Sequence, residues 1–415
     1  MMHRMTTLTR VAGVAALCAL AACDSKRDVL GPPAPGGNAM FLSYVAIGNS
    51  ITAGFQSNGI NDSTQRQSYA YLLATKSMGT RFAIPSLVKP GCPAPIANTQ
   101  TGALVDNAPA LGCSFRDSAS VTDILNDVAV PGARVLDPIS RSTVASNGLT
   151  QFILGGKSQV ERALEARPTF ATVWIGNNDV LTAGLSGILV PQPAIGQAGI
   201  ISTQAQFQQS YDTLVSRLTA GAPGIKGVLI GVAQVANLPS LSSGALIASS
   251  PAIQAGISAA AGVPVTVHPN CTGSASLINV PSLVTAIRAK SPVAPPVISC
   301  APGAPGLPFP IGDLFVLDSA EQATLSGVVN GYNAYIKQKA DAVGFAYYDP
   351  NPLFAAKRAS GEIPAFPNFA SPTQTFGPLI SLDGIHPTLA AHILIANQLV
   401  DVINAKYGTS LKPVQ

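Results

Sequence analysis

Short apolar runs alternate along the chain with longer segments whose apolar residues recur at helical spacing. Such runs are typical of buried strands, and the expected strands are residues 41–47, 170–175, 227–235 and 345–348. The expected helices are residues 67–75, 158–166, 204–218 and 320–342, with a last helix that begins at Pro387 and ends near residue 405. Strands separated by helices form parallel sheets that are covered on both faces. The pattern therefore predicts an α/β fold.

One segment departs from this alternation. Residues 227–287 contain no Asp, Glu, Lys or Arg and no Phe, Tyr or Trp, and they are rich in Ala, Ser and Gly. A membrane-binding or lid segment would carry aromatic or long aliphatic anchors. We therefore expect a buried strand followed by a neutral, loop-rich insertion at about residues 240–318, within a main domain over residues 41–410.

The N-terminal residues have the layout of an export signal and a tether. Two arginines in residues 1–10 precede an apolar run over residues 11–22, which is too short to span a bilayer. The run closes in the sequence LAAC, which resembles the bacterial lipobox and implies a signal peptide over residues 1–22 and a lipidated Cys23. An ordinary cleaved signal with an incidental cysteine is the alternative. Residues 23–40 are polar and then Pro/Gly-rich, as in a flexible tether. We expect a protein that is exported and anchored by lipid to a bacterial membrane, on the periplasmic face or at the cell surface.

Composition and charge narrow the class of protein. The chain has 415 residues, of which 47% are hydrophobic and 11% are charged, as in a globular fold with loop-rich connections. The formal net charge of +4 does not indicate a nucleic-acid partner.

Because the protein is expected to be exported, the cysteines beyond the lipobox are candidates for disulfides. Four remain, at Cys92, Cys113, Cys271 and Cys300. An even number in an oxidising compartment suggests disulfides, and four cysteines allow three pairings. We favour Cys92–Cys113 and Cys271–Cys300, because each pair brackets one Pro/Gly-rich loop. A zinc site is disfavoured, because no pair has CxxC spacing and the few histidines are not clustered near the cysteines.

Ser50 is the first candidate for chemistry, in the sequence VAIGNSITAG where an apolar run passes into a small polar turn. A serine becomes a nucleophile only with a base, a group that orients the base, and donors for the oxyanion. The candidate base is His386. Asp383 lies three residues before it, a spacing that lets the carboxylate fold back onto Nδ1 and leaves Nε2 free to accept a proton. Surface or core roles suit His268 and His392 better, since one lies in the neutral insertion and the other within the last helix.

Two further segments supply candidate oxyanion donors. Asn178, in the sequence WIGNND, lies in a polar turn that follows a buried strand. Gly132, in a Pro-Gly turn, can donate a backbone N–H. Asn and Gly also occupy turns for purely structural reasons. However, Ser50 and Asn178 follow strands and His386 precedes a helix. In a parallel sheet the three then share the edge at the carboxyl ends of the strands, where open α/β sheets place their sites.

Read in order, four blocks of this chain resemble the SGNH (GDSL) hydrolases. The blocks are Gly48-Asn49-Ser50, Gly132, Gly176-Asn177-Asn178-Asp179 and Asp383-Gly384-Ile385-His386. The resemblance covers about residues 41–405 and implies a flavodoxin-like three-layer α/β sandwich with a parallel sheet. It also implies that Ser50 is the nucleophile, that His386 is the base oriented by Asp383, and that the Ser50 N–H, the Gly132 N–H and the Asn178 side chain form the oxyanion hole. No G-x-S-x-G sequence occurs, which weighs against the other common α/β hydrolase fold.

The function implied by this resemblance is ester hydrolysis through an acyl-enzyme, which requires neither a metal nor an organic cofactor. The substrate would be a small-molecule, lipid or glycan ester. We expect an esterase or lipase, with a carbohydrate O-deacetylase as an alternative within the same chemistry. The third hypothesis is a surface binding protein with impaired chemistry, because the first block of the family usually reads Gly-Asp-Ser and this chain has Asn49.

Overall fold

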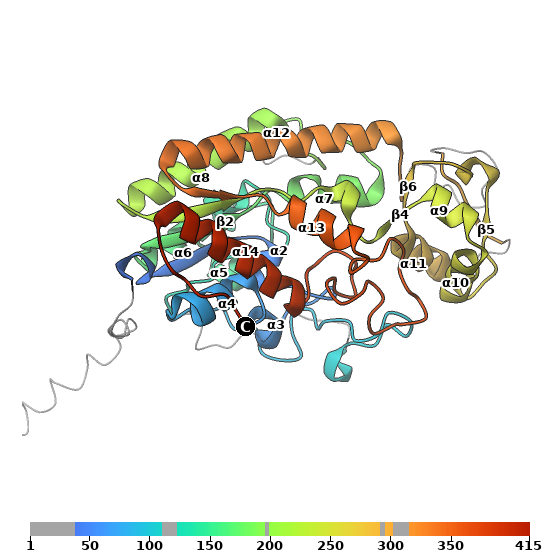
Figure 1. Cartoon of the computed structure of the whole chain (residues 1–415), viewed down its shortest axis with the longest axis horizontal. Coiled ribbons are helices and arrows are strands. Elements are labelled where there is room, and N and C mark those ends of the chain that lie inside the picture. The colour runs from blue at the N-terminus through green and yellow to red at the C-terminus, as the bar shows by residue number, and fades with distance from the viewer. Residues whose placement is uncertain (1–37, 110–122, 196–198, 291–294, 302–314) are drawn as a thin grey trace, which may run out of the picture. The chain divides into compact units, whose positions relative to one another are not determined.

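The computed structural model describes residues 38–109, 123–195, 199–290, 295–301 and 315–415, and its central element is a parallel sheet of four strands (Figure 1). The strands, in spatial order, are β1 (Tyr44–Gly48), β2 (Phe170–Trp174), β3 (Lys226–Ile230) and β9 (Ala346–Tyr348). Tyr44 pairs with Phe170 and Phe170 pairs with Lys226, so the first three strands start level with one another. Their carboxyl ends therefore lie along one edge of the sheet.

A short segment extends the sheet beyond β1. Ala46 N donates to Asn126 O at 2.8 Å and Val128 N donates to Ala46 O at 3.0 Å, and the bridge between Ala46 and Asp127 is parallel. With this segment counted as the second strand along the chain, the spatial order becomes 2-1-3-4-5, as in flavodoxin-like sheets. The topology expected from the resemblance is confirmed.

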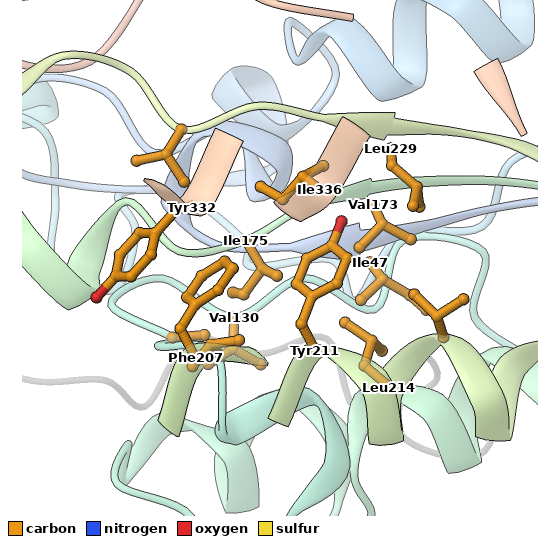
Figure 2. Close-up of a cluster of buried hydrophobic side chains, with 14 of the residues drawn as sticks. Ile47, Val130, Val173, Ile175, Phe207, Tyr211, Leu214, Leu229, Tyr332 and Ile336 are labelled. Atoms are coloured by element: carbon orange, nitrogen blue, oxygen red, sulfur yellow. The ribbon is translucent and has the colours of Figure 1, made fainter. Parts of the chain in front are cut away.

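Alternate residues of each strand face two different layers of helices. Ile47, Val173 and Leu229 are fully buried against the first layer, where Phe207 stacks on Tyr332 with ring centroids 3.9 Å apart (Figure 2). Helices of this layer include α6 (Gln159–Glu165), α7 (Asn178–Ser186), α8 (Gln204–Gly221) and α12 (Ser319–Val343). Each fully buried aliphatic or aromatic side chain contributes about 1.5–3 kcal/mol, so this face supplies a large part of the core.

The other face of the sheet carries the second layer. Tyr44, Phe170 and Trp174 are fully buried there. The elements of this layer are α4 (Tyr69–Leu72), the π-helix η2 (Leu73–Met78) and α14 (Leu389–Tyr407). Two layers of helices around one parallel sheet make the three-layer α/β sandwich predicted above.

Further helices in the described part of the chain are α2 (Ser50–Ala53), α3 (Asp62–Gln65), α5 (Leu149–Leu154) and α13 (Asn351–Ala359). Short 3-10 turns lie at Ala39–Phe41, Val105–Asn107, Asp137–Ile139, Val235–Asn237 and Pro269–Cys271.

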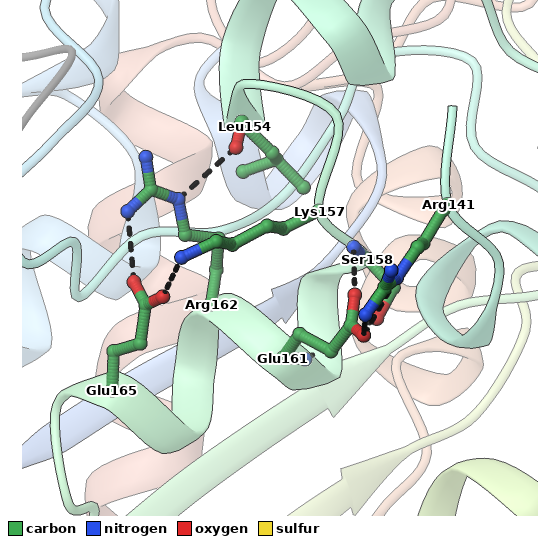
Figure 3. Close-up of polar contacts among 7 residues, drawn as sticks. All are labelled: Arg141, Leu154, Lys157, Ser158, Glu161, Arg162 and Glu165. Atoms are coloured by element: carbon green, nitrogen blue, oxygen red, sulfur yellow. Dashed lines mark hydrogen bonds and ion pairs between the residues drawn. The ribbon is translucent and has the colours of Figure 1, made fainter. Parts of the chain in front are cut away.

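The start of α6 is held by a cap and an ion pair (Figure 3). Ser158 Oγ accepts from Glu161 N at 3.2 Å, and Glu161 Oε2 accepts from Ser158 N at 2.9 Å, which forms a capping box. Arg141 adds an ion pair to Glu161 at 2.7 Å. The arginine side chain is 70% exposed, so water screens the ion pair, whereas a cap is worth about 1 kcal/mol. The cap therefore fixes where the helix begins and where Gln159, its first residue, is placed.

The insertion has more regular structure than the sequence predicts. Its strands are β4 (Leu241–Ser243), β6 (Leu277–Asn279) and β8 (Val316–Leu317), which form an antiparallel sheet, and the parallel pair β5 (Thr266–Val267) and β7 (Val297–Ile298). Its helices are α9 (Gly244–Ser249), α10 (Pro251–Ala261) and α11 (Val280–Lys290). The expectation of a loop-rich segment is corrected, because Ile253, Ile257 and Ala260 recur at helical spacing and pack into a separate hydrophobic cluster. Without charged residues on the opposite face, this periodicity is hard to recognise.

A disulfide links Cys271 to Cys300 within the insertion, in the pairing favoured from the sequence. Cys92 is 2% exposed, and its expected partner Cys113 lies outside the described residues. The Cys92–Cys113 pairing stays a prediction. The expected signal peptide, Cys23 and the tether through residue 37 also lie outside the described residues.

Two predicted boundaries are wrong for identifiable reasons. The strand expected over residues 227–235 ends at Ile230, because asparagine side chains, rather than a neighbouring strand, accept hydrogen bonds from the N–H groups of residues 232–234. Pro387 does not open the last helix. It pairs with Ile380 in an antiparallel bridge, and Thr388 becomes the N-cap of α14.

Candidate active site

Ser50 lies where β1 passes into a single turn of helix. Asn49 is the N-cap of α2, and its Oδ1 accepts from Ile51 N at 3.1 Å. Asn49 is 1% exposed, and its Nδ2 has no hydrogen-bond partner among the described residues. Because capping needs only an acceptor oxygen, Asn49 supports this turn as an aspartate would. Ser50 is the first helical residue, so its own N–H lacks an intrahelical partner.

Gly48, two residues before Ser50, is clamped by a side chain from α6. Gly48 N donates to Gln159 Oε1 at 2.9 Å, and Gln159 Nε2 donates to Gly48 O at 3.0 Å. A Cβ at position 48 would lie 2.3 Å from Thr52 Oγ1 and 2.9 Å from Trp174 O, so only glycine fits there. The paired bonds fix the end of β1 and hence the position of Ser50. Gln159 was not among the residues selected from the sequence, because it resembles any polar residue at the start of a helix.

The side chains of Ser50, His386 and Asp383 form a continuous line of hydrogen bonds. His386 Nε2 lies 2.8 Å from Ser50 Oγ, and His386 Nδ1 lies 2.8 Å from Asp383 Oδ2. Ser50 and His386 are each 7% exposed. An ionised carboxylate can only accept, so Nδ1 carries the proton and the neutral imidazole presents Nε2 as an acceptor to the serine hydroxyl. The structure thus brings together the three residues that the sequence selected.

Asp383 is held as a carboxylate by its surroundings. Burial by itself would raise the pKa of Asp383, but the charge and hydrogen bonds of His386, together with backbone N–H donors, lower it to about 2. Oδ1 accepts from Ile385 N and His386 N, each at 2.9 Å, and from Ser381 Oγ at 3.0 Å. Oδ2 also accepts from Asn58 N at 2.9 Å. The carboxylate is therefore ionised at neutral pH and fixed in one orientation.

A loop that follows α2 supports the Asp383 segment from the other side. Ser57 N donates to Ser381 Oγ at 2.9 Å, and Leu382 N donates to Ser57 Oγ at 3.1 Å. Ser57 and Asn58 both adopt left-handed backbone conformations, with φ of 54° and 59°. Non-glycine residues pay a cost of about 1–3 kcal/mol for sparsely populated conformations of this kind, so the contacts around them must enforce the geometry. Sequence reasoning missed Ser57, Asn58 and Ser381.

The two remaining candidate donors lie together. Val130–Ala133 is a turn in which Ala133 N donates to Val130 O at 3.0 Å, with Pro131 second and Gly132, at φ +79°, third. In such a type II turn the third residue requires a positive φ, and its N–H takes no part in the closing bond of the turn. Asn178 Nδ2 donates to Ala133 O at 2.9 Å, which places the amide beside the turn and leaves its second hydrogen for another acceptor.

Asp179, beside Asn178, ties the residues just after this turn to α7. It is fully buried, Oδ2 accepts from Val135 N at 2.9 Å and Oδ1 accepts from Ser202 Oγ at 2.5 Å. Burial raises the pKa of Asp179 to about 6, although both hydrogen bonds oppose the shift. Asp179 therefore positions the segment that carries Gly132.

The other two histidines considered above have structural roles, as expected. His268 is exposed, and its Nδ1 accepts from Asn270 N at 3.2 Å. His392 is fully buried in α14, where its Nδ1 accepts from Tyr69 N at 3.1 Å. Burial lowers the pKa of His392 to about 3, so the ring is neutral.

Ser50 and His386 open into a pocket whose walls are mostly apolar. Its empty space, including the part open to solvent, is about 790 Å³. The apolar wall is formed by Leu181, Val235, Leu238, Phe354, Ile363 and Ile380. Asn178, Gln234 and Arg358 are among the polar residues that also line it. A pocket of this kind suits an organic substrate with an apolar part.

Within residues 38–415, excluding the undescribed gaps, no group of three or more His, Cys, Asp or Glu side chains is arranged to hold a metal ion. The described helices include none that is both long and apolar enough to cross a membrane.

Similar solved structures include an extracellular lipase from Streptomyces rimosus and a mutant of an acetylxylan esterase from Geobacillus stearothermophilus. The lipase is 15% identical, with 88% of this chain and 99% of the lipase covered and a TM-score of 0.37. The esterase is 12% identical, with 89% of this chain and 94% of the esterase covered and a TM-score of 0.37. A search of curated proteins found no match.

The sequence profile of GDSL-like lipases and acylhydrolases matches residues 44–399, which span β1, the described part of the insertion and most of α14. The match includes Ser50, Gly132, Asn178, Asp383 and His386. The chain therefore belongs to the family of GDSL-like lipases and acylhydrolases, and it is an enzyme that hydrolyses ester bonds.

Proposed function

We propose that the enzyme is a serine esterase that works through an acyl-enzyme on Ser50. The observation that carries this proposal is the line of hydrogen bonds from Ser50 Oγ through His386 to Asp383, with both distances at 2.8 Å. This is the arrangement in which a serine hydroxyl can be deprotonated as it attacks.

In the proposed first step, Ser50 Oγ attacks the ester carbonyl carbon while its proton passes to His386 Nε2. The C–O bond to the leaving alcohol then breaks, and the alcohol takes that proton from His386. In the second step, water gives a proton to His386 and attacks the acyl-enzyme, and the carboxylic acid leaves as Ser50 recovers its proton. Asp383 stays ionised throughout and holds the imidazolium that forms in each step.

The negative charge on the carbonyl oxygen needs donors that are already in position. The proposal assigns this role to the Ser50 N–H, the Gly132 N–H and Asn178 Nδ2. It is supported by the helix start at Ser50, by the outward N–H of a type II turn and by the Asn178 bond to Ala133 O. Each such donor typically contributes 10²- to 10³-fold to kcat.

The proposed substrate is an ester with an apolar chain. The apolar wall beside Ser50 and His386 supports this choice, since an acetyl group would leave most of that wall uncovered. An O-deacetylase of carbohydrates shares the same chemistry and is separated from a lipase or esterase by its chain-length preference.

We also propose that the enzyme is exported and anchored to a bacterial membrane through a lipid on Cys23. The LAAC sequence after an apolar run of signal length supports this location. Metabolic labelling with a radioactive fatty acid should mark the wild type and not the Cys23→Ala variant. Labelling of both proteins, or of neither, would refute lipidation at Cys23.

The test of the enzymatic proposal is hydrolysis of p-nitrophenyl esters from acetate to decanoate by the full-length chain, with Ser50→Ala and Ser216→Ala in parallel. Ser216 is an exposed serine of α8 and serves as the matched control. We expect turnover to be fastest with esters longer than acetate, a loss on the order of a thousandfold or more in Ser50→Ala, and no change in Ser216→Ala.

Other outcomes would select the other hypotheses. A preference for acetate together with release of acetate from acetylated sugars would favour the O-deacetylase. If folded wild-type protein hydrolyses no ester and a fluorophosphonate does not label Ser50, the serine esterase is refuted and a binding function takes its place.

A further inference from the structure

One arginine, on α13, is among the described residues that line the pocket beside Ser50. Arg358 lines the pocket, is partly buried, and its Nη1 donates to Asn237 O at 2.9 Å. A guanidinium has five N–H groups, so this single bond leaves most of its donors for other acceptors.

Arg358 has no carboxylate partner among the described residues, unlike its neighbour. Lys357 forms an ion pair with Glu362 at 2.8 Å, and no acidic side chain is present among the described residues of the pocket wall. Burial lowers the pKa of Arg358, and no acid of the described segments opposes that shift. A partly buried cation without a counter-charge is costly, and the cost falls when an anion binds.

We propose that Arg358 binds an oxyanion group of the substrate, so that the preferred ester combines an apolar chain with a phosphate or a carboxylate. This inference rests on the proposed function, because it describes a ligand of the same pocket. Arginine suits the role, since its planar guanidinium forms two parallel hydrogen bonds with either oxyanion. The apolar wall around it strengthens the attraction, because charges interact more strongly where water is excluded.

A purely structural role for Arg358 makes a different prediction. The bond to Asn237 O joins α13 to the 3-10 turn Val235–Asn237, and both segments form the pocket wall. If this bond were the only function of the side chain, its loss would weaken charged and neutral ligands equally. If Arg358 binds an oxyanion, removing its side chain weakens the binding of charged ligands alone.

The experiment measures binding rather than turnover. The full-length protein is titrated by calorimetry at neutral pH and low salt with octyl phosphate, octanoate and 1-octanol. The two anions are kept below their micelle concentrations and 1-octanol below its solubility limit. The proteins are the wild type, Arg358→Gln and Arg217→Gln. Arg217 is a matched control, because it also donates to a backbone carbonyl, Ile139 O at 2.9 Å, but does not line the pocket.

For the wild type we expect octyl phosphate or octanoate to bind about 10- to 100-fold more tightly than 1-octanol, the effect of charge-assisted hydrogen bonds. The comparison of the two anions identifies which oxyanion is preferred. In Arg358→Gln this advantage should fall to about threefold or less, and in Arg217→Gln it should be unchanged. The anion affinity of the wild type should also fall as salt rises, while that of 1-octanol stays constant.

Three results would overturn the inference. These are equal affinities of the wild type for both anions and 1-octanol, an anion advantage that persists in Arg358→Gln, or equal weakening of all three ligands in that variant. If Arg358→Gln does not fold, the salt dependence of the wild type decides. Because binding needs no turnover, a protein that binds octyl phosphate through Arg358 but cleaves no ester would refute the esterase and leave the anion site standing.

Discussion

Replacing Asp383 by asparagine should abolish activity and also destabilise the protein. An asparagine has one acceptor oxygen and one NH₂ group, whereas both oxygens of Asp383 accept hydrogen bonds. If the NH₂ takes the place of Oδ2, it faces the N–H groups of Asn58 and His386 Nδ1. If it takes the place of Oδ1, it faces the backbone N–H groups of Ile385 and His386.

The magnitudes follow from these conflicts. In the second orientation two backbone N–H groups lose their acceptor at about 1–3 kcal/mol each, which lowers the free energy of unfolding by about 2–6 kcal/mol. In the first orientation His386 must switch tautomer and can no longer accept the Ser50 proton. A wrong tautomer of this kind lowers kcat by about 10⁴-fold in a serine–histidine–aspartate enzyme.

The pH dependence adds an independent check. The pKa of Asp383 is lowered from 3.8 to about 2, so the native state holds the carboxylate more firmly than the unfolded state does. That preference contributes about 2 kcal/mol above pH 4, and it is lost as the pH falls through 2. The wild type, but not Asp383→Asn, should therefore lose this stability between pH 4 and pH 2.

Urea unfolding of the two proteins at pH 7 measures the loss in free energy of unfolding, and unfolding across the acid range measures its pH dependence. Ester hydrolysis at pH 7 measures the loss in kcat. Asp401→Asn is the control, since Asp401 is exposed on α14 and its replacement should change stability by less than about 0.5 kcal/mol. The reasoning would be refuted if Asp383→Asn kept more than about a tenth of the wild-type kcat, or if its stability at pH 7 equalled that of the wild type.

Further changes test other parts of the structure. Burial raises the pKa of Asp127 to about 8, so the native state binds the Asp127 proton more tightly than the unfolded state does. The free energy of unfolding should therefore fall by up to about 1.4 kcal/mol per pH unit as the pH rises from 4 to 8. Asp127→Asn should remove this slope in urea unfolding, and an unchanged slope would contradict the assignment. Gly132→Ala should lower stability by about 1–3 kcal/mol and should also lower kcat, because φ is +79° and the new Cβ would lie 2.8 Å from an amide nitrogen. Unaltered kinetics would exclude a positioning role for the turn. Asn178→Ala should lower kcat by about 10²- to 10³-fold with little change in KM, whereas a change in KM alone would argue against an oxyanion donor. Replacing Cys271 and Cys300 by serine should cost about 3–4 kcal/mol for a separation of 29 residues, seen as a lower Tm, and an equal Tm would show that the insertion does not need the bond.

The parts of the site that the sequence predicts are those that depend on short-range spacing. Asp383 and His386 are three residues apart, so the turn that joins them can be read locally. Ser50 and Asn178 each follow an apolar run that forms a strand, and parallel strands bring their carboxyl ends to one edge. The α/β class follows from the same alternation of strands and helices.

The parts that the sequence does not predict depend on contacts between distant segments. Ser57 meets Ser381 across 324 positions, and Gln159 meets Gly48 across 111 positions. Nothing local marks these residues, and Ser57 adopts a left-handed φ without being a glycine. In the insertion, by contrast, the helical spacing of apolar residues is a local feature of the sequence. It is hard to recognise because the opposite face of the helix carries no charged residues.

Under the proposed mechanism, the distance between Ser50 and His386 along the chain also determines when activity can appear during synthesis. The two residues are 336 positions apart, and His386 directly precedes α14, the last helix of the sandwich. A growing chain therefore displays the serine for most of its synthesis without a base to activate it. If the two residues act as proposed, hydrolysis can begin only after His386 has reached Ser50, so an incomplete chain, or one clipped and separated between the two residues, leaves the esters around it intact.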